Sequence, residues 1–302
     1  MKFSFDDDQL AFRDAVRDLL AKELDVRIPA RSVWDALAEM GVLSILVPED
    51  AGGMGLDERW LVLLLEETGY AGLPQPIVET AAVAMPLVAG DIEPGALITT
   101  DLGGPIVPWA ADADWVLLDG PLRITEEVRF EQVATVDEHR RAARVTGEGR
   151  VLEGADRDLA FDRGAWGQAA FLVGLAQRML DITVAYVSER QQFGVPVGSF
   201  QAVKHHLADA ALQLAFARPA VYRAAWSLAS DDSNRARDVS MAKAMASDAA
   251  LLAGRKALQC HGAIGYTEEA DLHLYLKRSW ALARSWGDGA WHRDRIGTAL
   301  GV

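Results

Sequence analysis

The spacing of apolar residues divides the chain into a helical start, a strand-rich middle and a helical end. Over the first ninety residues, apolar side chains recur every three or four positions, which predicts amphipathic helices. Asp6 to Asp8 supply a cap and the negative charge that favours a first helical turn. The predicted helices cover the runs DDDQLAFRDAVRDLLAKEL, SVWDALAEMGV, LDERWLVLLLEETGYAG and VETAAVAMPLVA.

The pattern changes between Ala96 and Gly147, where short β-rich runs alternate with Gly, Pro and Asp. These runs are ALITT, PIVPWA, DWVLLD, LRITEEV, EQVATV and AARVTG, and they predict a small antiparallel β unit. After Asp156 four long apolar-striped helices follow, the second of them capped by Ser199, and they predict a bundle. The predicted fold is mainly α with a small β domain. It consists of an N-terminal helical domain (1–93), a shortened antiparallel β domain (94–157) and a C-terminal four-helix bundle (158–302).

Composition narrows the possible partners. Half of the 302 residues are apolar, and the net charge is −14 with a pI near 4.9, which argues against nucleic acid or an anionic membrane as partner. No run of 18 apolar residues predicts a membrane span, and the first residues lack the apolar core of a signal peptide. With Cys260 as the single cysteine, a cytoplasmic location is expected. The six histidines are scattered, so no zinc site is predicted.

The stretch SERQQFGVPVGSFQAVKHHLADA, from Ser188 to Ala210, interrupts two good helices with a charged and aromatic corner. Arg190 offers a fork of donors that matches phosphate oxygens. Phe193 and Gly194 turn the chain, and Gln201 lies one turn into the next helix, where its amide can reach a base edge. A plain bundle corner, with a solvated arginine and a packed phenylalanine, explains the same residues, and spacing alone favours it.

A second stretch, LQCHGAIGYTEEADLHLYLKR, joins two later helices and contains Gln259, Gly262 and Gly265. Glycines at a helix junction let a ligand approach the backbone closely. Such glycines are usually turns or C-caps, so this stretch alone is a weak signal.

Together these stretches resemble the acyl-CoA dehydrogenase family, and the resemblance covers nearly the whole chain. RQQFG followed by Gln201, and QCHGAIG, resemble the two C-terminal flavin signatures of that family. FDRGAWGQAAFLVGLAQRMLDITVAYVSERQQFG resembles its long helix, and LVPEDAGGMGL followed by LLLEETGYAG resembles its N-terminal domain. The resemblance implies helical, β and bundle domains in this order. It also implies desaturation of an acyl-CoA thioester with FAD, which passes electrons to an acceptor such as a flavoprotein.

The resemblance implies that the two signatures reach across a subunit interface to the neighbour's FAD. Arg190 then neutralises the pyrophosphate, Phe193 packs near it, and Gln201 lies towards the adenine. The cofactor-contacting residues implied in this way are Arg190, Phe193, Gly194, Gln201, Gln259, Gly262 and Gly265. Ala263 stands where the family usually has a second glycine, which is a mild change.

Two departures concern the catalytic side. The β region is about half the usual length and lacks a stretch like TEPxxGSD to hold the flavin ring. Trp109 and Trp115 have no hydroxyl neighbours, and Trp109 is expected in the core. The family's base is a carboxylate beside the substrate α carbon, but its two usual positions align with Gly287 and Gly164. Asp288 is either a displaced base or the cap of a helix near Trp291, and the cap is favoured.

These departures predict half of an enzyme. The chain resembles the short subunit of α2β2 acyl-CoA dehydrogenases of bacterial steroid catabolism. There, a larger homologous chain carries the base, and each heterodimer holds one FAD. A bulky, steroid-derived acyl-CoA is the expected substrate by analogy. Two alternatives stay open: a self-sufficient homo-oligomer that uses Asp288 as its base, and a non-catalytic helical scaffold.

Overall fold

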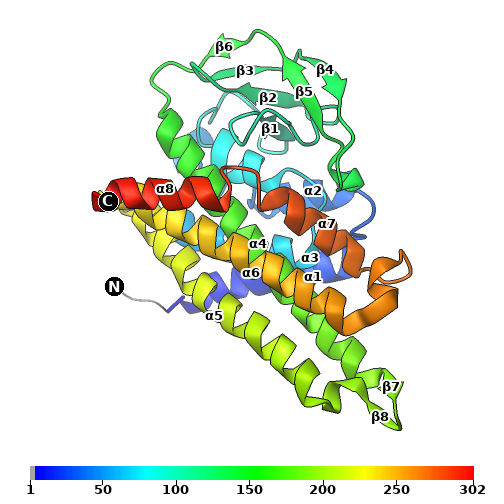
Figure 1. Cartoon of the computed structure of the whole chain (residues 1–302). Coiled ribbons are helices and arrows are strands. Elements are labelled where there is room, and N and C mark those ends of the chain that lie inside the picture. Colours follow the sequence, from blue (N-terminus) through cyan, green and yellow to red (C-terminus); the bar gives the residue numbers. More distant parts are fainter. Residues whose placement is uncertain (1–3) are drawn as a thin grey trace.

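The computed structural model describes residues 4–302 and shows helices, a small strand region and a helical bundle in the predicted order (Figure 1). The first three residues of the predicted 1–93 domain lie outside the described residues. The N-terminal part comprises α1 (Asp7–Glu23), α2 (Arg31–Glu39), the 3-10 turn η1 (Glu49–Ala51), α3 (Glu58–Ala71) and η2 (Val78–Ala84). The Asp6 cap is confirmed: its carboxylate accepts the Gln9 backbone N–H, and the Gln9 side chain accepts the Asp6 N–H.

The fourth predicted helix takes a different form. Residues Val78–Ala84 form a π-helix in which every residue is buried. π-helical turns are rare and often occur at functional sites. Hydrophobic periodicity over so short a run cannot separate this form from an α-helix.

The strand region holds two small sheets. One has the order β1 (Ile98–Thr100), β2 (Trp115–Leu118), β3 (Arg123–Thr125), β6 (Arg150–Val151), and the other pairs β4 (Arg129–Gln132) with β5 (Ala143–Thr146). The prediction of a purely antiparallel unit is wrong, because β1 and β2 run parallel, with Ile98 opposite Trp115. Residues 101–114 between them are long enough for a crossover connection. PIVPWA forms turns and a single bridge from Val107 to Ala143, and is not a strand.

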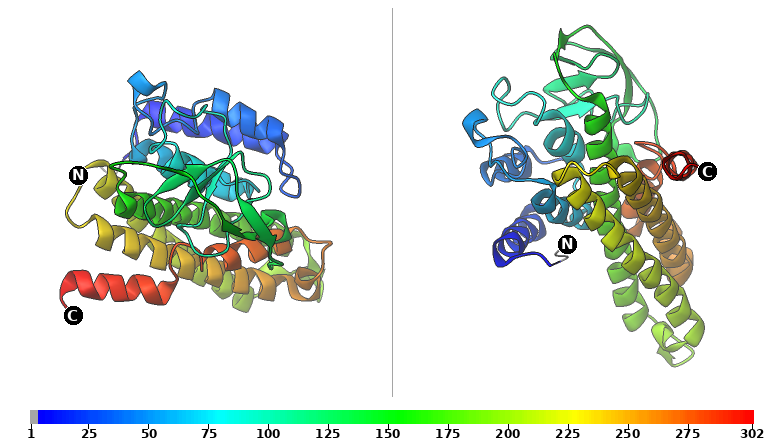
Figure 2. Two further views of the ribbon diagram at one scale, coloured as in Figure 1. Left: turned by 90° about the horizontal axis from the view of Figure 1, so that it is seen from above. Right: turned by 90° about the vertical axis from the view of Figure 1, so that its left-hand side faces the viewer.

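The strand region also contains a 3-10 turn, η3 (Glu138–Arg140), between β4 and β5, and the bundle follows this region. It consists of α4 (Arg157–Glu189), α5 (Gln201–Ala229), α6 (Arg235–His261), α7 (Leu272–Leu282) and α8 (Gly289–Leu300). The helices α4, α5 and α6 pack together, while α7 and α8 lie along α6 (Figure 2). The predicted Ser199 cap is wrong: Phe200 occupies the cap position of α5, and the Ser199 hydroxyl donates to the Pro196 carbonyl.

Helix α4 is the centre of the protein. By length and composition it could cross a membrane, but 61% of its most apolar window is buried inside the protein, as in the core helix of a bundle. It touches α3 backbone to backbone. A Cβ on Gly69 of α3 would lie 2.1 Å from the Phe171 carbonyl oxygen, and one on Gly174 of α4 would lie 2.0 Å from that of Glu66.

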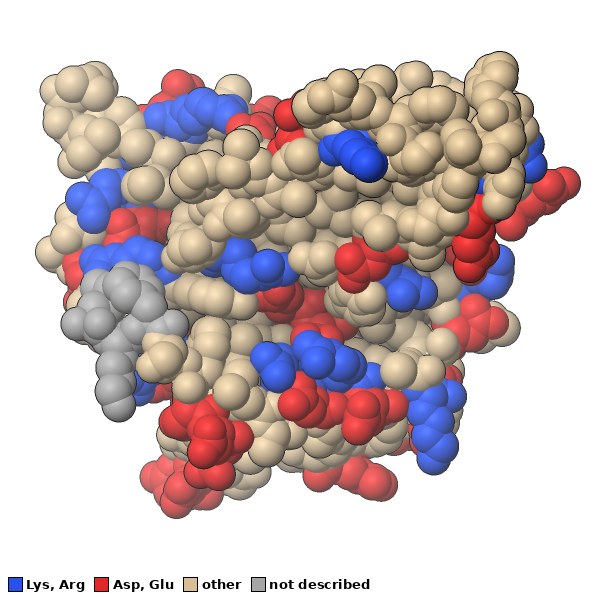
Figure 3. Space-filling model, turned by 90° about the horizontal axis from the view of Figure 1, so that it is seen from below, with Lys and Arg blue, Asp and Glu red and all other residues tan. Residues whose placement is uncertain are grey.

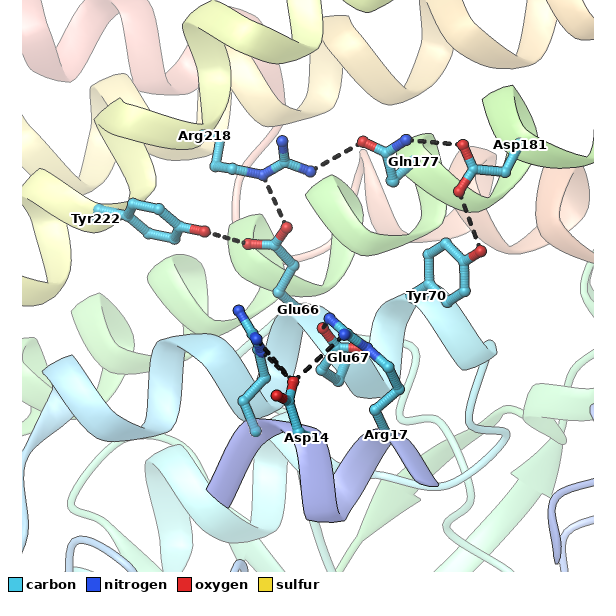
Figure 4. Close-up of polar contacts among 10 residues, drawn as sticks. Asp14, Arg17, Glu66, Glu67, Tyr70, Gln177, Asp181, Arg218 and Tyr222 are labelled. Carbon is cyan, nitrogen blue, oxygen red and sulfur yellow. Dashed lines mark hydrogen bonds and ion pairs between the residues drawn. The ribbon is translucent and has the colours of Figure 1, made fainter. Parts of the chain in front are cut away.

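A polar network also joins the N-terminal helices to the bundle (Figure 4). Glu66 of α3 accepts hydrogen bonds from Arg218 Nε and from the Tyr222 hydroxyl of α5, each at 2.8 Å. The Tyr70 hydroxyl donates to Asp181 of α4 at 3.0 Å. Burial raises the pKa of Tyr222, so it remains a neutral donor. The network fixes α3 against both neighbouring helices of the bundle.

Candidate functional site: a phosphate-facing corner and a closed joint

The corner between α4 and α5 is a tight β-hairpin. Strands β7 (Gln191–Gln192) and β8 (Val195–Pro196) pair across a two-residue turn, and η4 (Val197–Ser199) leads into α5. Both turn residues have left-handed φ, +54° at Phe193 and +81° at Gly194, as a type I′ turn requires. Phe193 is 93% exposed and contacts only the ring of Phe200 among aromatic side chains in the described residues. A phenylalanine packed into a plain bundle corner is therefore not what the chain forms.

Arg190 is fixed by its backbone and open at its side chain. Its N–H donates to the Tyr186 carbonyl at 2.9 Å, and its carbonyl accepts the Val197 N–H at 2.8 Å. Within residues 4–302 no carboxylate pairs with its exposed guanidinium. Gln201, also exposed, begins α5. The corner thus offers a positioned cation and an amide to a ligand outside this chain.

The joint between α6 and α7 presents open backbone. Gly262 has φ +65°, and a Cβ there would meet no atom within 4 Å, so the space beside it is clear. Gln259 and Ala263 are exposed around it. Gly265, in η5 (Gly262–Tyr266), is different: it is buried, and a Cβ there would lie 3.0 Å from both His261 and Leu258. Of the two glycines, Gly262 has the geometry for ligand approach.

An aromatic stack brings the two signature stretches together. The Tyr186 ring near the end of α4 lies parallel to His261 at the end of α6, with ring centroids 4.4 Å apart. Burial lowers the pKa of His261, which keeps the imidazole neutral. Sequence analysis missed this pair, since nothing local marks a histidine at a helix end as a stacking partner. The stack holds the Arg190 end of α4 against the Gly262 end of α6.

These features fit the pyrophosphate-bearing end of a dinucleotide. Arg190 supplies a cation that has no carboxylate partner in residues 4–302, which suits a phosphate. Gly262 leaves clear space beside its backbone, and Phe193 presents an exposed ring. Residues 4–302 hold no group of three or more His, Cys, Asp or Glu side chains that could hold a metal ion.

The joint between α7 and α8 has the opposite character. Asp288 is the N-cap of α8, and its exposed carboxylate accepts the Trp291 N–H at 2.9 Å. That hydrogen bond holds the pKa of Asp288 below its usual range. A base for this chemistry needs a dry site that raises its pKa. Of the two positions where a base was expected, Gly164 faces the buried Trp286 ring, and Gly287 follows Trp286 in the chain and faces Trp291 and His292.

Beside this joint lies a buried cluster of two acids and two bases that sequence analysis missed. The cluster consists of Glu79, Asp137, Arg140 and Arg278. Arg278 donates to Asp137 at 2.9 Å and to the Gly72 carbonyl at 2.6 Å. Burial raises the pKa of Glu79 and lowers that of Arg140. The one available signal was a lone acid in the apolar run IVETAAVAM.

Trp109 and Trp115, the two tryptophans considered for a flavin-ring site, pack within the strand region. Trp109 is buried, as expected, with the Arg140 guanidinium 5.3 Å from its ring centroid. Trp115 is half-buried on β2. A small cavity near Trp109 is also lined by Gln75 and Gln168, and the Trp109 Nε1 and Gln75 Oε1 atoms have no partner in the described residues. It is far too small for a ring system, since its water-accessible space is about that of one water molecule.

Comparison with known proteins identifies the class. The acyl-CoA dehydrogenase N-terminal domain matches residues 6–91, and the acyl-CoA dehydrogenase C-terminal domain matches residues 158–301. The chain is 35% identical over 263 residues to acyl-CoA dehydrogenase IpdE2 of Mycobacterium tuberculosis, covering 82% of this chain and 80% of that protein. The chain therefore belongs to the acyl-CoA dehydrogenase family, and FAD is its cofactor.

Solved structures confirm the fold. The Tcur3481–Tcur3483 steroid ACAD G363A variant superposes with a TM-score of 0.88 at 24% identity, covering 97% of this chain and 98% of that one. The ChsE4–ChsE5 complex from Mycobacterium tuberculosis superposes with a TM-score of 0.87 at 21% identity, covering 100% and 99%. The predicted fold class is confirmed, apart from the parallel β1–β2 pair. The domain boundaries at 93/94 and 157/158 stay predictions.

Proposed function

We propose that this chain is the non-base-carrying subunit of a heteromeric FAD-dependent acyl-CoA dehydrogenase. Its larger homologous partner carries the base, and two of each chain form an α2β2 assembly. The observation that carries the proposal is the contrast between the two halves of the site. Arg190 at the corner faces outward and has no carboxylate partner in residues 4–302, while both usual base positions, 164 and 287, are glycines and Asp288 caps α8.

The reaction follows from the family. FAD, when bound, supplies the acceptor for the hydride removed from the substrate β carbon. A carboxylate of the partner takes the α proton, and an electron-transfer flavoprotein reoxidises the cofactor. This chain's part is to bind and orient: Arg190 offsets the pyrophosphate charge, and Gln201 and Gly262 border the nucleotide. Asp288, exposed and committed to capping α8, is poorly suited to the self-sufficient alternative.

The surface and the relatives support a partner chain. Helix α5 turns Leu212 and Phe216 outward, 60% and 62% exposed. The underside, where Figure 1 places α5 and the β7–β8 hairpin, carries a broad area with few charged side chains (Figure 3). Large exposed apolar areas mark interaction sites. Because one structural neighbour is a steroid ACAD and another is a two-protein complex, we propose a bulky steroid-derived acyl-CoA as substrate.

The test is the flavin content of the chain co-produced with the homologous dehydrogenase chain, and of the same pair carrying Arg190→Ala. We expect one FAD per heterodimer in the native pair. Loss of a charged hydrogen bond to phosphate costs about 1.5–3 kcal/mol, so the FAD dissociation constant of the variant should rise about 10- to 100-fold. Isothermal titration of the flavin-stripped pair with FAD measures this change.

Arg129→Ala is the matched control, because Arg129 is also an exposed arginine, on β4 at the opposite end of the molecule (Figure 1). It should leave FAD affinity unchanged. Equal FAD affinity for Arg190→Ala and the native pair would refute the donor role. A homo-oligomer of this chain alone that binds one FAD per subunit would refute the heteromeric assembly.

A further inference from the structure

The side chain of Trp286 fills a slot that is walled by two glycines. It is 1% exposed, although Asp288, two residues further along the chain, faces solvent. A Cβ on Gly164 of α4 would lie 2.2 Å from Trp286 Cζ3, and a Cβ on Gly103 would lie 2.8 Å from its Cε2 and Nε1. The Trp286 N–H also donates to the Gly103 carbonyl at 2.8 Å. The indole is therefore held between α4 and the loop after β1, where only glycine leaves room for it.

The indole lies where a base would have to reach. A carboxylate side chain at position 164 would extend directly into the ring, because the first carbon of that side chain already overlaps it. Position 287 is adjacent to Trp286, and a Cβ there would lie 2.6 Å from the Trp291 ring and 2.9 Å from His292 Nε2. Trp286 thus fills the space in front of position 164, and the Trp291 and His292 rings fill the space in front of position 287.

Other groups hold the indole in place. The Phe161 ring lies 5.8 Å from it, centroid to centroid. The buried His292 donates from Nε2 to the Trp286 carbonyl at 2.8 Å, and its Nδ1 lies 3.1 Å from the Ser240 hydroxyl. Lys243 donates to the next carbonyl, that of Gly287, at 3.2 Å. The backbone that follows the indole is therefore anchored to α6 and α8.

We propose that Trp286 is a built-in plug that closes this chain's own catalytic centre to planar rings and acyl thioesters. This inference rests on the proposed function and specifies it: flavin ring and acyl group are both held in the partner's centre. The plug takes the place of a ligand and stabilises the junction of α4, the β region and α7 in the way that a bound ligand would.

The experiment removes the Trp286 side chain and tests whether free indole binds in the space that it leaves. Trp286→Gly is prepared in the full chain, co-purified with its partner, and the thermal midpoint is measured with increasing free indole. Glycine suits the left-handed φ of +57° at this position, so the variant isolates the lost side chain. We expect the midpoint to fall by about 5–10 °C. Indole should then raise it saturably in the variant, and should not raise it in the native pair.

Asp231→Gly is the matched control, because its backbone is also left-handed but its side chain is exposed and lies outside the FAD-facing corner. It should lower no midpoint and show no indole response. If indole leaves the Trp286→Gly midpoint unchanged, the slot is not a ligand-shaped site and the proposal is overturned.

A second pair of variants keeps the test decisive if Trp286→Gly folds poorly. Gly164→Ala should lower the midpoint of the native pair, since its methyl group collides with the indole. The same Gly164→Ala change should lower the midpoint much less in a Trp286→Phe background, where the ring is smaller. Equal losses in both backgrounds would overturn the plug. These readouts are the response of the midpoint to indole and the coupling between positions 164 and 286, whereas Arg190→Ala is read as FAD affinity, so failure of one prediction and failure of the other are distinguishable.

Discussion

Two aromatic–glycine pairs in this chain have the same backbone and opposite surroundings. Phe193–Gly194 has φ values of +54° and +81°, and Trp286–Gly287 has +57° and +82°. Yet the first ring is 93% exposed and the second 1% exposed. The turn itself therefore does not decide whether a ring is offered to a ligand or buried. The exposure of each ring depends on what lies opposite it: solvent at the bundle tip for Phe193, and Gly103 and Gly164 for Trp286.

The largest expected effect comes from removing a charge from the buried cluster of Glu79, Asp137, Arg140 and Arg278, which lies beside the α7–α8 joint. Asp137→Asn leaves the fully buried Arg278 without its carboxylate, and breaking such a pair from one side costs about 3–5 kcal/mol of unfolding free energy. Urea denaturation measures the loss. Asp91→Asn breaks the exposed pair with Arg150 and should cost under about 1 kcal/mol. Equal losses would show that the buried cluster contributes no more than a surface pair.

Acid should lower the free energy of unfolding through His292, which is buried beside the α7–α8 joint. Burial, reinforced by nearby Lys243, lowers the pKa of His292 to about 4, against about 6.5 in an unfolded chain. Between these values the unfolded chain binds the proton and the folded chain does not. Stability from this group is thus complete above pH 6.5 and falls as pH drops towards 4. From pH 7 to pH 5 the expected loss of unfolding free energy is about 2 kcal/mol.

Urea titrations at pH 7 and pH 5 test this expectation. His292→Asn should remove about 2 kcal/mol of the difference between the two pH values. His205→Asn, on the exposed face of α5, should leave the difference unchanged. An unaltered pH dependence in His292→Asn would mean that another group carries it.

The smallest expected effect breaks the comparison directly. Phe193→Gly replaces a strained left-handed residue, and it loses little buried surface because the ring is exposed. The free energy of unfolding should therefore rise slightly, by about 0.5–1 kcal/mol. The change is measured by urea denaturation beside Trp286→Gly, which should shift the other way. A clear loss of stability in Phe193→Gly would show that the exposed ring already has a structural role in the chain.

Sequence patterns predicted the local features and missed the long-range ones. Periodicity located α1, α3 and the bundle helices, because each buries a continuous stripe, and the Asp6 cap is a local signal. The parallel β1–β2 pair and the Tyr186–His261 stack depend on chain segments that meet only after folding. The same holds for Trp286: its slot is formed by glycines more than 100 residues away, so no window around it reveals the closure.

The contact between Gly69 and Phe171 has a mechanical consequence. Two helices whose backbones touch, with no flexible side chain between them, form a stiff joint that transmits displacement instead of absorbing it. The Glu66 side chain, clamped by Arg218 and Tyr222, adds a second fixed point along the same seam. One continuous helix, α4, therefore links the β7–β8 hairpin to the β region, and α3 braces it between these two ends.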